Sequence, residues 1–330
     1  MLIKSFITGK RGEGFDSIED SMALDTNAGR YAISDGVTYS FLPKIWSNIL
    51  VQAWLTIDDI EQFSHMNLSE SFLQERNRIM DVLDEDTRMD YEDWEDVYQT
   101  ASATFCGVQI RNGILKWGVL GDTCLFLLLP DEHPRCISSR PMPTDESGHI
   151  TPSFDNRPNQ ILADGRIYGE WVRGEMPFEK GTILLMSDAM SAWFINAHND
   201  DKDPLSQLLA LSDNDAFEQW VDEQVNLGLL GDDDESVIII QIDDMHFPYH
   251  TETFGNAESV LGDASSKVAM TNACGNTISK TNISNIDKSN ATNSIEEDYY
   301  CIRKKRLTIA TKLALIKRRF RIKYKHKNDK

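Results

Sequence analysis

Short apolar runs separated by polar turns dominate the first 247 residues. Such runs, bounded by turn residues, predict strands. Eight are found: Leu2–Thr8, Ser21–Leu24, Arg30–Ser34, Ala103–Ile110, Ile114–Leu120, Cys124–Leu129, Thr182–Met186 and Val237–Ile242. Asn112-Gly113 joins the fourth run to the fifth, and both residues tolerate the positive φ of a tight turn. That pair of strands is therefore predicted to be an antiparallel hairpin.

Helical spacing marks three longer stretches. Leu42–Leu55 has apolar residues at positions 42, 45, 46, 49, 50, 53 and 54, which form one face of a helix. Residues 57–100 and 203–227 are also predicted to be largely helical, with acidic outer faces. Because the strands come in groups and do not alternate strictly with helices, the pattern favours a layered α+β domain over a doubly wound parallel sheet.

The pattern changes after the last apolar run. Residues 251–298 contain 20 Ser, Thr and Asn among 48 residues, a composition that buries too little apolar surface to offset chain entropy. Beyond them one helical stripe is formed by Ile309, Leu313, Ile316, Phe320 and Tyr324, with Lys and Arg on the other faces. We therefore predict a domain at 1–247, a flexible linker at 248–299 and a basic amphipathic helix at 300–330.

The charged residues are also distributed unevenly along the chain. The chain carries a net charge of −20, yet residues 302–330 hold 13 of the 33 Lys and Arg and one of the 53 acids, so this segment is +12 and the rest is −32. Such a body is poorly suited to nucleic acid, whereas the basic helix suits an anionic surface. A membrane surface, nucleic acid, a partner protein and the acidic body itself all stay open as its binding partner.

Cysteines and apolar run lengths suggest the compartment. The five cysteines are scattered and contain no Cys-x-x-Cys pair, so neither a disulfide framework nor a zinc knuckle is indicated. The start of the chain has no basic leader followed by a long apolar stretch, and no apolar run reaches the roughly 18 residues of a transmembrane helix. A cytoplasmic protein without a transmembrane segment is expected.

Acidic residues gather at the turns that border the apolar runs. The clusters are Glu19-Asp20, Asp35-Gly36, Gly121-Asp122, Ser187-Asp188 and Asp232-Asp233-Asp234. Magnesium and manganese prefer oxygen ligands, and strand ends are places where a fold can bring carboxylates together. Since Gly36 has no side chain, its carbonyl could approach a cation as closely as the carboxylate of Asp35 does. The pattern predicts a metal site.

Each cluster alone has a plainer interpretation. Asp35-Gly36 is also a common turn sequence, and Gly-Asp-Thr around Asp122 is good hairpin chemistry. The run at 232–234 could be an ordinary acidic loop. What favours a site is that the clusters occur together, four of the five directly beside an apolar run.

Six short motifs carry a family resemblance. They are Ile18-Glu19-Asp20-Ser21, Ser34-Asp35-Gly36-Val37, Ala101-Ser102-Ala103-Thr104, Val119-Leu120-Gly121-Asp122-Thr123, Leu185-Met186-Ser187-Asp188 and Asp233-Asp234-Glu235-Ser236-Val237. Over roughly residues 10–242 their order resembles that of the metal-dependent protein phosphatases of the type 2C family, in a compact bacterial-style form. The resemblance implies a four-layer α-β-β-α sandwich and hydrolysis of phosphoserine or phosphothreonine on proteins. It also implies a phosphoprotein substrate and a partner Ser/Thr kinase.

The resemblance further implies a binuclear manganese or magnesium site. Asp35 would bridge the two metals, and Asp188 and Asp233 would hold the first. The carbonyl of Gly36 would hold the second. A metal-activated hydroxide would then attack phosphorus in line, without a protein nucleophile.

Three further acids receive roles from the same resemblance. Glu19 and Asp20 would act through water or by orienting the ligands. Asp122 matches a position that, together with Asp188, can bind a third cation. If the local register differs by one residue, Asp232 or Asp234 would be the ligand in place of Asp233.

Four positions depart from the family pattern: Ala189 replaces a usual glycine, Asp234 stands where Asn is common, and the other two bear on activity. Phe15 stands where many members have a phosphate-binding Arg, and Val37 stands where some have a His proposed as general acid. These departures motivate an alternative function: a catalytically weak or inactive pseudophosphatase that acts as a phosphoprotein-binding or partner-binding module.

Overall fold

The computed structural model describes residues 1–12, 17–57, 59–83, 85–154 and 158–243, together with 270–271 and 277–278. The chain divides into two compact units, Met1–Glu13 with Ile18–Thr251, and Gly14–Ser17 with Glu252–Lys330. In the second unit, β14 (Met270–Thr271) pairs with β15 (Thr277–Ile278). The rest of the predicted linker and the whole predicted basic helix lie outside the described residues, so the three-part division stays a prediction.

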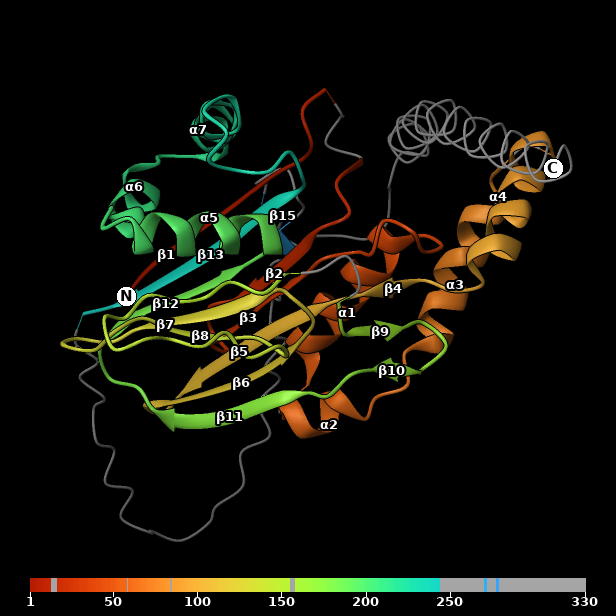
Figure 1. The fold of residues 1–330 in the computed structure, drawn as a ribbon. Coiled ribbons are helices and arrows are strands. Elements are labelled where there is room, and N and C mark those ends of the chain that lie inside the picture. Colours follow the sequence, from red (N-terminus) through yellow and green to blue (C-terminus); the bar gives the residue numbers. More distant parts are fainter. Residues whose placement is uncertain are drawn as a thin grey trace, which may run out of the picture. The chain divides into compact units, whose positions relative to one another are not determined.

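Two five-stranded antiparallel sheets form the centre of the first unit (Figure 1). The first sheet has the order β1 (Leu2–Thr8), β13 (Glu235–Ile242), β12 (Gly181–Met186), β7 (Cys124–Leu128), β8 (Arg135–Ile137). The second has the order β11 (Val172–Pro177), β6 (Ile114–Leu120), β5 (Phe105–Arg111), β3 (Arg30–Ser34), β2 (Ser21–Asp25). A smaller sheet joins β10 (Ile167–Tyr168), β9 (Gln160–Leu162) and β4 (Ser102–Ala103).

Alternate residues of the central strands enter two different cores. Ile183 and Leu185 of β12 pack with Ile238 of β13 and with Tyr31 and Val119 of the second sheet, so this core fills the space between the sheets. Successive side chains of a strand point to opposite faces. The neighbours of these residues along β12 therefore face away from the second sheet, and continuous apolar runs result because both faces are covered.

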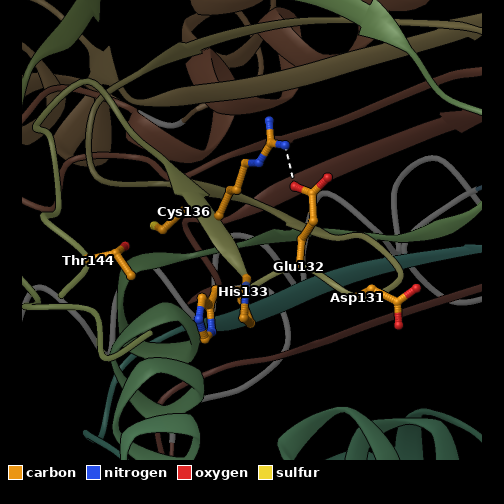
Figure 2. A pocket seen from close by; sticks show the side chains of 7 residues that line it. Asp131, Glu132, His133, Cys136 and Thr144 are labelled. Atoms are coloured by element: carbon orange, nitrogen blue, oxygen red, sulfur yellow. Dashed lines mark hydrogen bonds and ion pairs between the residues drawn. The ribbon is translucent and has the colours of Figure 1, made fainter. Parts of the chain in front are cut away.

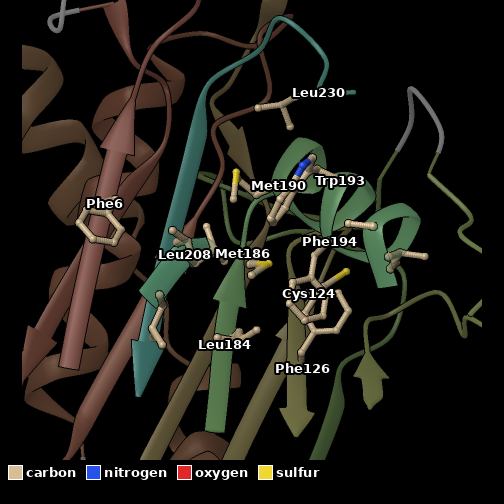
Figure 3. Close-up of a cluster of buried hydrophobic side chains, with 14 of the residues drawn as sticks. Phe6, Cys124, Phe126, Leu184, Met186, Met190, Trp193, Phe194, Leu208 and Leu230 are labelled. Carbon is tan, nitrogen blue, oxygen red and sulfur yellow. The ribbon is translucent and has the colours of Figure 1, made fainter. Parts of the chain in front are cut away.

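The outer face of the first sheet is covered by helices. Leu184 and Met186 lie in one buried cluster with Trp193 and Phe194 of α5 (Asp188–Asn199) and with Phe217 of α7 (Asn214–Asn226) (Figure 3). The short helix α6 (Pro204–Ala210) adds Leu208 to the same cluster.

Another set of helices accompanies the second sheet. In α1 (Pro43–Thr56), the indole of Trp54 donates a hydrogen bond of 3.3 Å to the carbonyl of Val108 in β5, and its ring meets Phe63 of α2 (Ile60–Ser64) edge to face. Ring contacts also connect α1 to α3 (Ser69–Met80), and the residue Phe41 to α4 (Glu85–Tyr98). The order of layers is helix, sheet, sheet, helix, which confirms the predicted α+β sandwich.

Several elements differ from the sequence prediction. The single helical stretch expected at 57–100 is three helices, α2 to α4, and the strand expected at 103–110 is interrupted at Thr104. The sequence prediction did not include the helix α5. It also missed the strands β8 to β11, because short or half-exposed strands such as β11 contain no apolar run. Among the described residues, no helix has the length and apolarity required to cross a membrane.

Candidate metal and phosphate site

The predicted acids converge at one edge of the two sheets. In an antiparallel sheet, the end of one strand lies beside the start of its neighbour. Asp20 precedes β2 and Asp35 follows β3, and these strands pair with Ser21 opposite Ser34. In the first sheet Met186 lies opposite Val237, which brings the end of β12, followed by Asp188, next to the start of β13. Four strand ends, those of β2, β3, β12 and β13, thus present carboxylates at this edge.

A hydrogen bond between Asp20 and Ser236 connects the two sheets at the acidic edge. The hydroxyl of Ser236 donates to Oδ2 of Asp20 at 2.6 Å, although the two residues are 216 positions apart. Ser236 is itself fixed by Ser187, because its N–H donates to Oγ of Ser187 at 3.1 Å and its carbonyl accepts from the N–H of Ser187 at 3.1 Å. Asp20 is 4% exposed, and its Oδ1 has no hydrogen-bond partner among the described residues.

Backbone contacts hold Asp35 and Gly36 in place. The carbonyl of Asp35 accepts from the N–H of Thr104 at 2.8 Å, and the N–H of Asp35 donates to Oγ1 of Thr104 at 3.2 Å. The N–H of Gly36 donates to the carbonyl of Glu19 at 3.3 Å. A Cβ at Gly36 would lie 2.8 Å from the backbone carbon of Pro43 and 2.9 Å from the oxygen of Glu19, so glycine is needed for this approach.

Asp122 occupies the turn between β6 and β7. Gly121 before it has φ +112°, and Oγ of Ser139 accepts from its N–H at 2.8 Å. Asp122 is 5% exposed, and its Oδ1 lacks a hydrogen-bond partner among the described residues. A residue that served only as a solvated turn would be exposed, so burial argues against the plain hairpin interpretation.

The three consecutive acids before β13 have three different surroundings. Asp234 is buried and accepts hydrogen bonds from the N–H groups of Glu19 at 2.7 Å and Lys10 at 3.3 Å. It therefore connects the segment between β1 and β2 to the loop before β13. Asp233 lies 2.9 Å from Nζ of Lys10. Asp232 faces outward to Arg11, at 3.5 Å.

The pKa shifts of these acids show that most of them repel one another. Burial raises the pKa of Asp35 well above its usual range, and the charges of Asp20, Asp188, Asp122 and Asp233 raise it further. Burial also raises the pKa of Asp20, with help from Asp234 and Asp188. The pKa of Asp188 is raised by burial and then by Asp233. Asp233 therefore acts on both predicted ligands, Asp35 and Asp188.

Buried carboxylates that repel one another are the kind of group that divalent cations stabilise. The donors are all oxygens, and the unpartnered oxygens of Asp20 and Asp122 are two buried atoms that a cation or its water could satisfy. In the described part of the chain, however, no three His, Cys, Asp or Glu side chains are placed to hold one metal ion together. The residues fit divalent cations in type and charge, and binding would have to draw the carboxylates closer.

In a chelator, the chain is expected to be about 2 kcal/mol less stable near pH 8.5 than near pH 6. Burial raises the pKa of Asp234 to about 6, of Asp122 to about 7 and of Glu235 to about 9. A folded-state pKa above the unfolded value gives stability at low pH that is lost as the pH rises through the folded pKa. Urea unfolding at the two pH values measures this. Equal stability at both would contradict it, and added Mn²⁺ should remove most of the difference.

Sequence reasoning missed the residues that hold the acids. Ser236 and Thr104 belong to two of the six sequence motifs, but the spacing of residues within those motifs does not indicate that they form hydrogen bonds with Asp20 and Asp35. Glu235 was also missed: it is 1% exposed, and its Oε1 accepts from the N–H of Asp233 at 3.3 Å. A polar residue that begins an apolar strand was the only available signal.

The predicted residues are not all equally placed by the structure. Glu19 is buried and lies beside Gly36 through its carbonyl, while its predicted role through water stays a prediction. Phe15 lies outside the described residues. Val37 is partly buried, and its N–H donates to the carbonyl of Ser102 at 3.0 Å, so its backbone belongs to the same edge.

A pocket of about 660 Å³ lies elsewhere, at the turn between β7 and β8 (Figure 2). It is lined by Asp131, Glu132, His133, Pro134, Arg135, Cys136 and Thr144. Asp122 precedes β7, whereas this turn follows it, so the pocket lies at the opposite end of that strand. An ion pair between Glu132 and Arg135 at its wall neutralises two of its charges.

Comparison with known proteins gave matches among solved structures. Stp1, a serine/threonine phosphatase from Staphylococcus aureus, is 18% identical with a TM-score of 0.45, and the match covers 74% of this chain and 96% of that one. A bacterial serine phosphatase is 14% identical with a TM-score of 0.44, covering 75% and 100%. The catalytic domain of PstP, solved with two manganese ions, is 17% identical with a TM-score of 0.42, covering 73% and 99%. No protein-family model and no curated protein matches the sequence. These similar structures are phosphatases by name.

Proposed function

We propose that this chain hydrolyses phosphoserine or phosphothreonine on proteins with the help of manganese or magnesium. The observation that carries the proposal is the convergence of mutually repelling carboxylates from both sheets: Asp20, Asp122 and Asp234 are buried, Asp35, Asp188 and Asp233 are half-buried, and two of the buried acids, Asp20 and Asp122, have unpartnered oxygens. The six ordered motifs add support from the sequence. A phosphoprotein substrate and a partner Ser/Thr kinase belong to the same proposal, as does a cytoplasmic location.

In this proposal, Asp35, Asp188 and Asp233, together with the carbonyl of Gly36, would hold two divalent cations. Asp122 and Asp188 are the residues for a third. Bound divalent cations offset the negative charge of the phosphoryl group and favour deprotonation of an attacking water.

The chain's own residues supply rigidity and orientation. The hydroxyl of Ser236 donates to Oδ2 of Asp20 and so fixes the orientation of that carboxylate. The other oxygen, Oδ1, has no hydrogen-bond partner among the described residues. Thr104 holds the backbone of Asp35 from both its N–H and its carbonyl side. Such supports limit the freedom of the acids, and preorganised charged groups are what phosphoryl transfer requires of a protein.

The alternative proposal is a pseudophosphatase that binds phosphoproteins or partners without turnover. It is favoured by one observation, the ion pair of 2.9 Å between Lys10 and Asp233, which engages a predicted ligand with a protein cation. A second, sequence-level reason is the pair of departures at Phe15 and Val37.

A hydrolysis assay with the full-length chain separates the two. The proposal expects release of phosphate from a phosphothreonine peptide that depends on added Mn²⁺ or Mg²⁺ and stops in excess chelator. Activity that persists in the chelator would reject the metal-dependent function. Tight Mn²⁺ binding, measured by calorimetry, without turnover of several phosphopeptides would favour the pseudophosphatase.

A further inference from the structure

Lys10 is a cation built into the rim of the acid cluster. It follows the end of β1, and its N–H donates to Oδ1 of Asp234 at 3.3 Å. Its Nζ lies 2.9 Å from Oδ1 of Asp233, with side-chain exposures of 27% for Lys10 and 49% for Asp233. The backbone of Lys10 thus bonds to one acid, while the ammonium group at the end of its partly buried side chain reaches another.

The charge of Lys10 acts on the site as a whole. Burial alone would lower the pKa of Lys10, yet the charges of Asp234, Asp233 and Glu19 raise it above its ordinary value. In return, Lys10 lowers the pKa of Asp188 and of Asp234. Lys10 is therefore in electrostatic contact with acids that lie at both predicted metal-binding strand ends.

Neighbouring cations are directed elsewhere. The guanidinium of Arg11 donates to the side-chain oxygen of Asn226 at 2.8 Å and pairs with Asp232 at 3.5 Å, which places it over the loop after α7. Arg140 lowers the pKa of Asp122. Among the described cations, Lys10 is the one that lies beside Asp233, and its ammonium group is carried by a flexible side chain of four carbons.

A substrate phosphate meets an electrostatic problem at this edge. A phosphate monoester carries close to two negative charges, and the cluster that must receive it is itself acidic. An ammonium group on the rim would offset this repulsion as a mobile point charge, which is how lysine commonly binds phosphate.

We propose that Lys10 binds the phosphoryl oxygens of the substrate, and that its ammonium group exchanges Asp233 for phosphate when Asp233 engages a divalent cation. The inference rests on the proposed function and names a residue that the sequence resemblance does not assign. Lys10 is then a substrate-binding residue and a competitor of the cation for Asp233. Loss of its charge should weaken phosphate binding without weakening cation binding.

The test uses the full-length variants Lys10→Met, which keeps the apolar stem, and Lys10→Arg, which keeps the charge. Inorganic phosphate is titrated into each protein by calorimetry in saturating Mg²⁺, and Mn²⁺ binding is followed by electron paramagnetic resonance. Lys10→Met is expected to raise the Kd for phosphate about tenfold, with Mn²⁺ affinity equal or higher, and Lys10→Arg should retain most phosphate affinity. Arg11→Met is the matched control and should bind phosphate like the wild type.

Two outcomes overturn the inference: unchanged phosphate affinity in Lys10→Met, or a loss of phosphate affinity in Arg11→Met as large as that in Lys10→Met. Weaker Mn²⁺ binding by Lys10→Met would also overturn it, because the change would then report damage to the acid cluster. Hydrolysis by the wild type tests the proposed function separately. A wild type without turnover, whose phosphate binding is nevertheless lost in Lys10→Met, would reject the activity and retain the role of Lys10.

Discussion

Replacing Asp35 by Asn is expected to lower Mn²⁺-dependent hydrolysis of a phosphopeptide by about 1,000-fold, as losses of central catalytic groups do. Asn keeps the shape of the side chain but removes the charge, and the bonds of the Asp35 backbone to Thr104 are retained. The folded chain should not suffer. Since burial, and then like charges, raise the pKa of Asp35, its ionised form destabilises the fold, and Asp35→Asn should melt at a higher temperature than the wild type in chelator near pH 8.

The three acids before β13 supply the control for this experiment. Asp232→Asn removes an exposed carboxylate that pairs with Arg11, and it should change the rate by less than about twofold. Asp233→Asn should be far slower, because Asp233 acts on both Asp35 and Asp188. A large loss in Asp232→Asn with none in Asp233→Asn would shift the predicted ligand by one position. An Asp35→Asn protein as active as the wild type would reject the site altogether.

The layered fold could be predicted because its central strands are covered on both faces. Val237–Ile242 is one apolar run because alternate residues enter two different cores. The hairpin of β5 and β6 is indicated by the turn residues Asn112-Gly113 alone. The exposed strand β11 could not be found in this way. Its residues alternate between exposed and half-buried positions, and its place is fixed by pairing with β6, a contact that no local pattern encodes.

The site was predictable in its acids but not in their connections. Asp20, Asp35, Asp122 and Asp188 stand beside apolar runs, so their position at strand ends follows from the sequence. The bond from Ser236 to Asp20 spans 216 residues, and the contact of Lys10 with Asp233 spans two loops. Such contacts depend on how the sheets stack, and local spacing does not determine them.

Gly36→Ala is expected to destabilise the chain by about 3 kcal/mol and to abolish most of its metal-dependent activity, because overpacking a close backbone contact forces the backbone apart. The added Cβ would lie 2.8 Å from the backbone carbon of Pro43 and 2.9 Å from the carbonyl oxygen of Glu19. Neither atom belongs to a flexible side chain, so relief requires a shift of the start of α1 or of the segment before β2. Either shift moves Asp35 against Asp20, whose mutual repulsion already raises the pKa of Asp35.

Gly231→Ala provides a matched comparison beside the same site, since an added Cβ there meets no atom within 4 Å. It should leave both the urea midpoint and the rate near wild-type values. Urea unfolding and the phosphopeptide assay measure both variants. A Gly36→Ala protein with wild-type stability and rate would show that the backbone around Gly36 can shift at little cost in free energy. A backbone that shifts so easily could not hold several repelling carboxylates close together. The close approach at Gly36 therefore tests the same rigidity on which the proposed cation site depends.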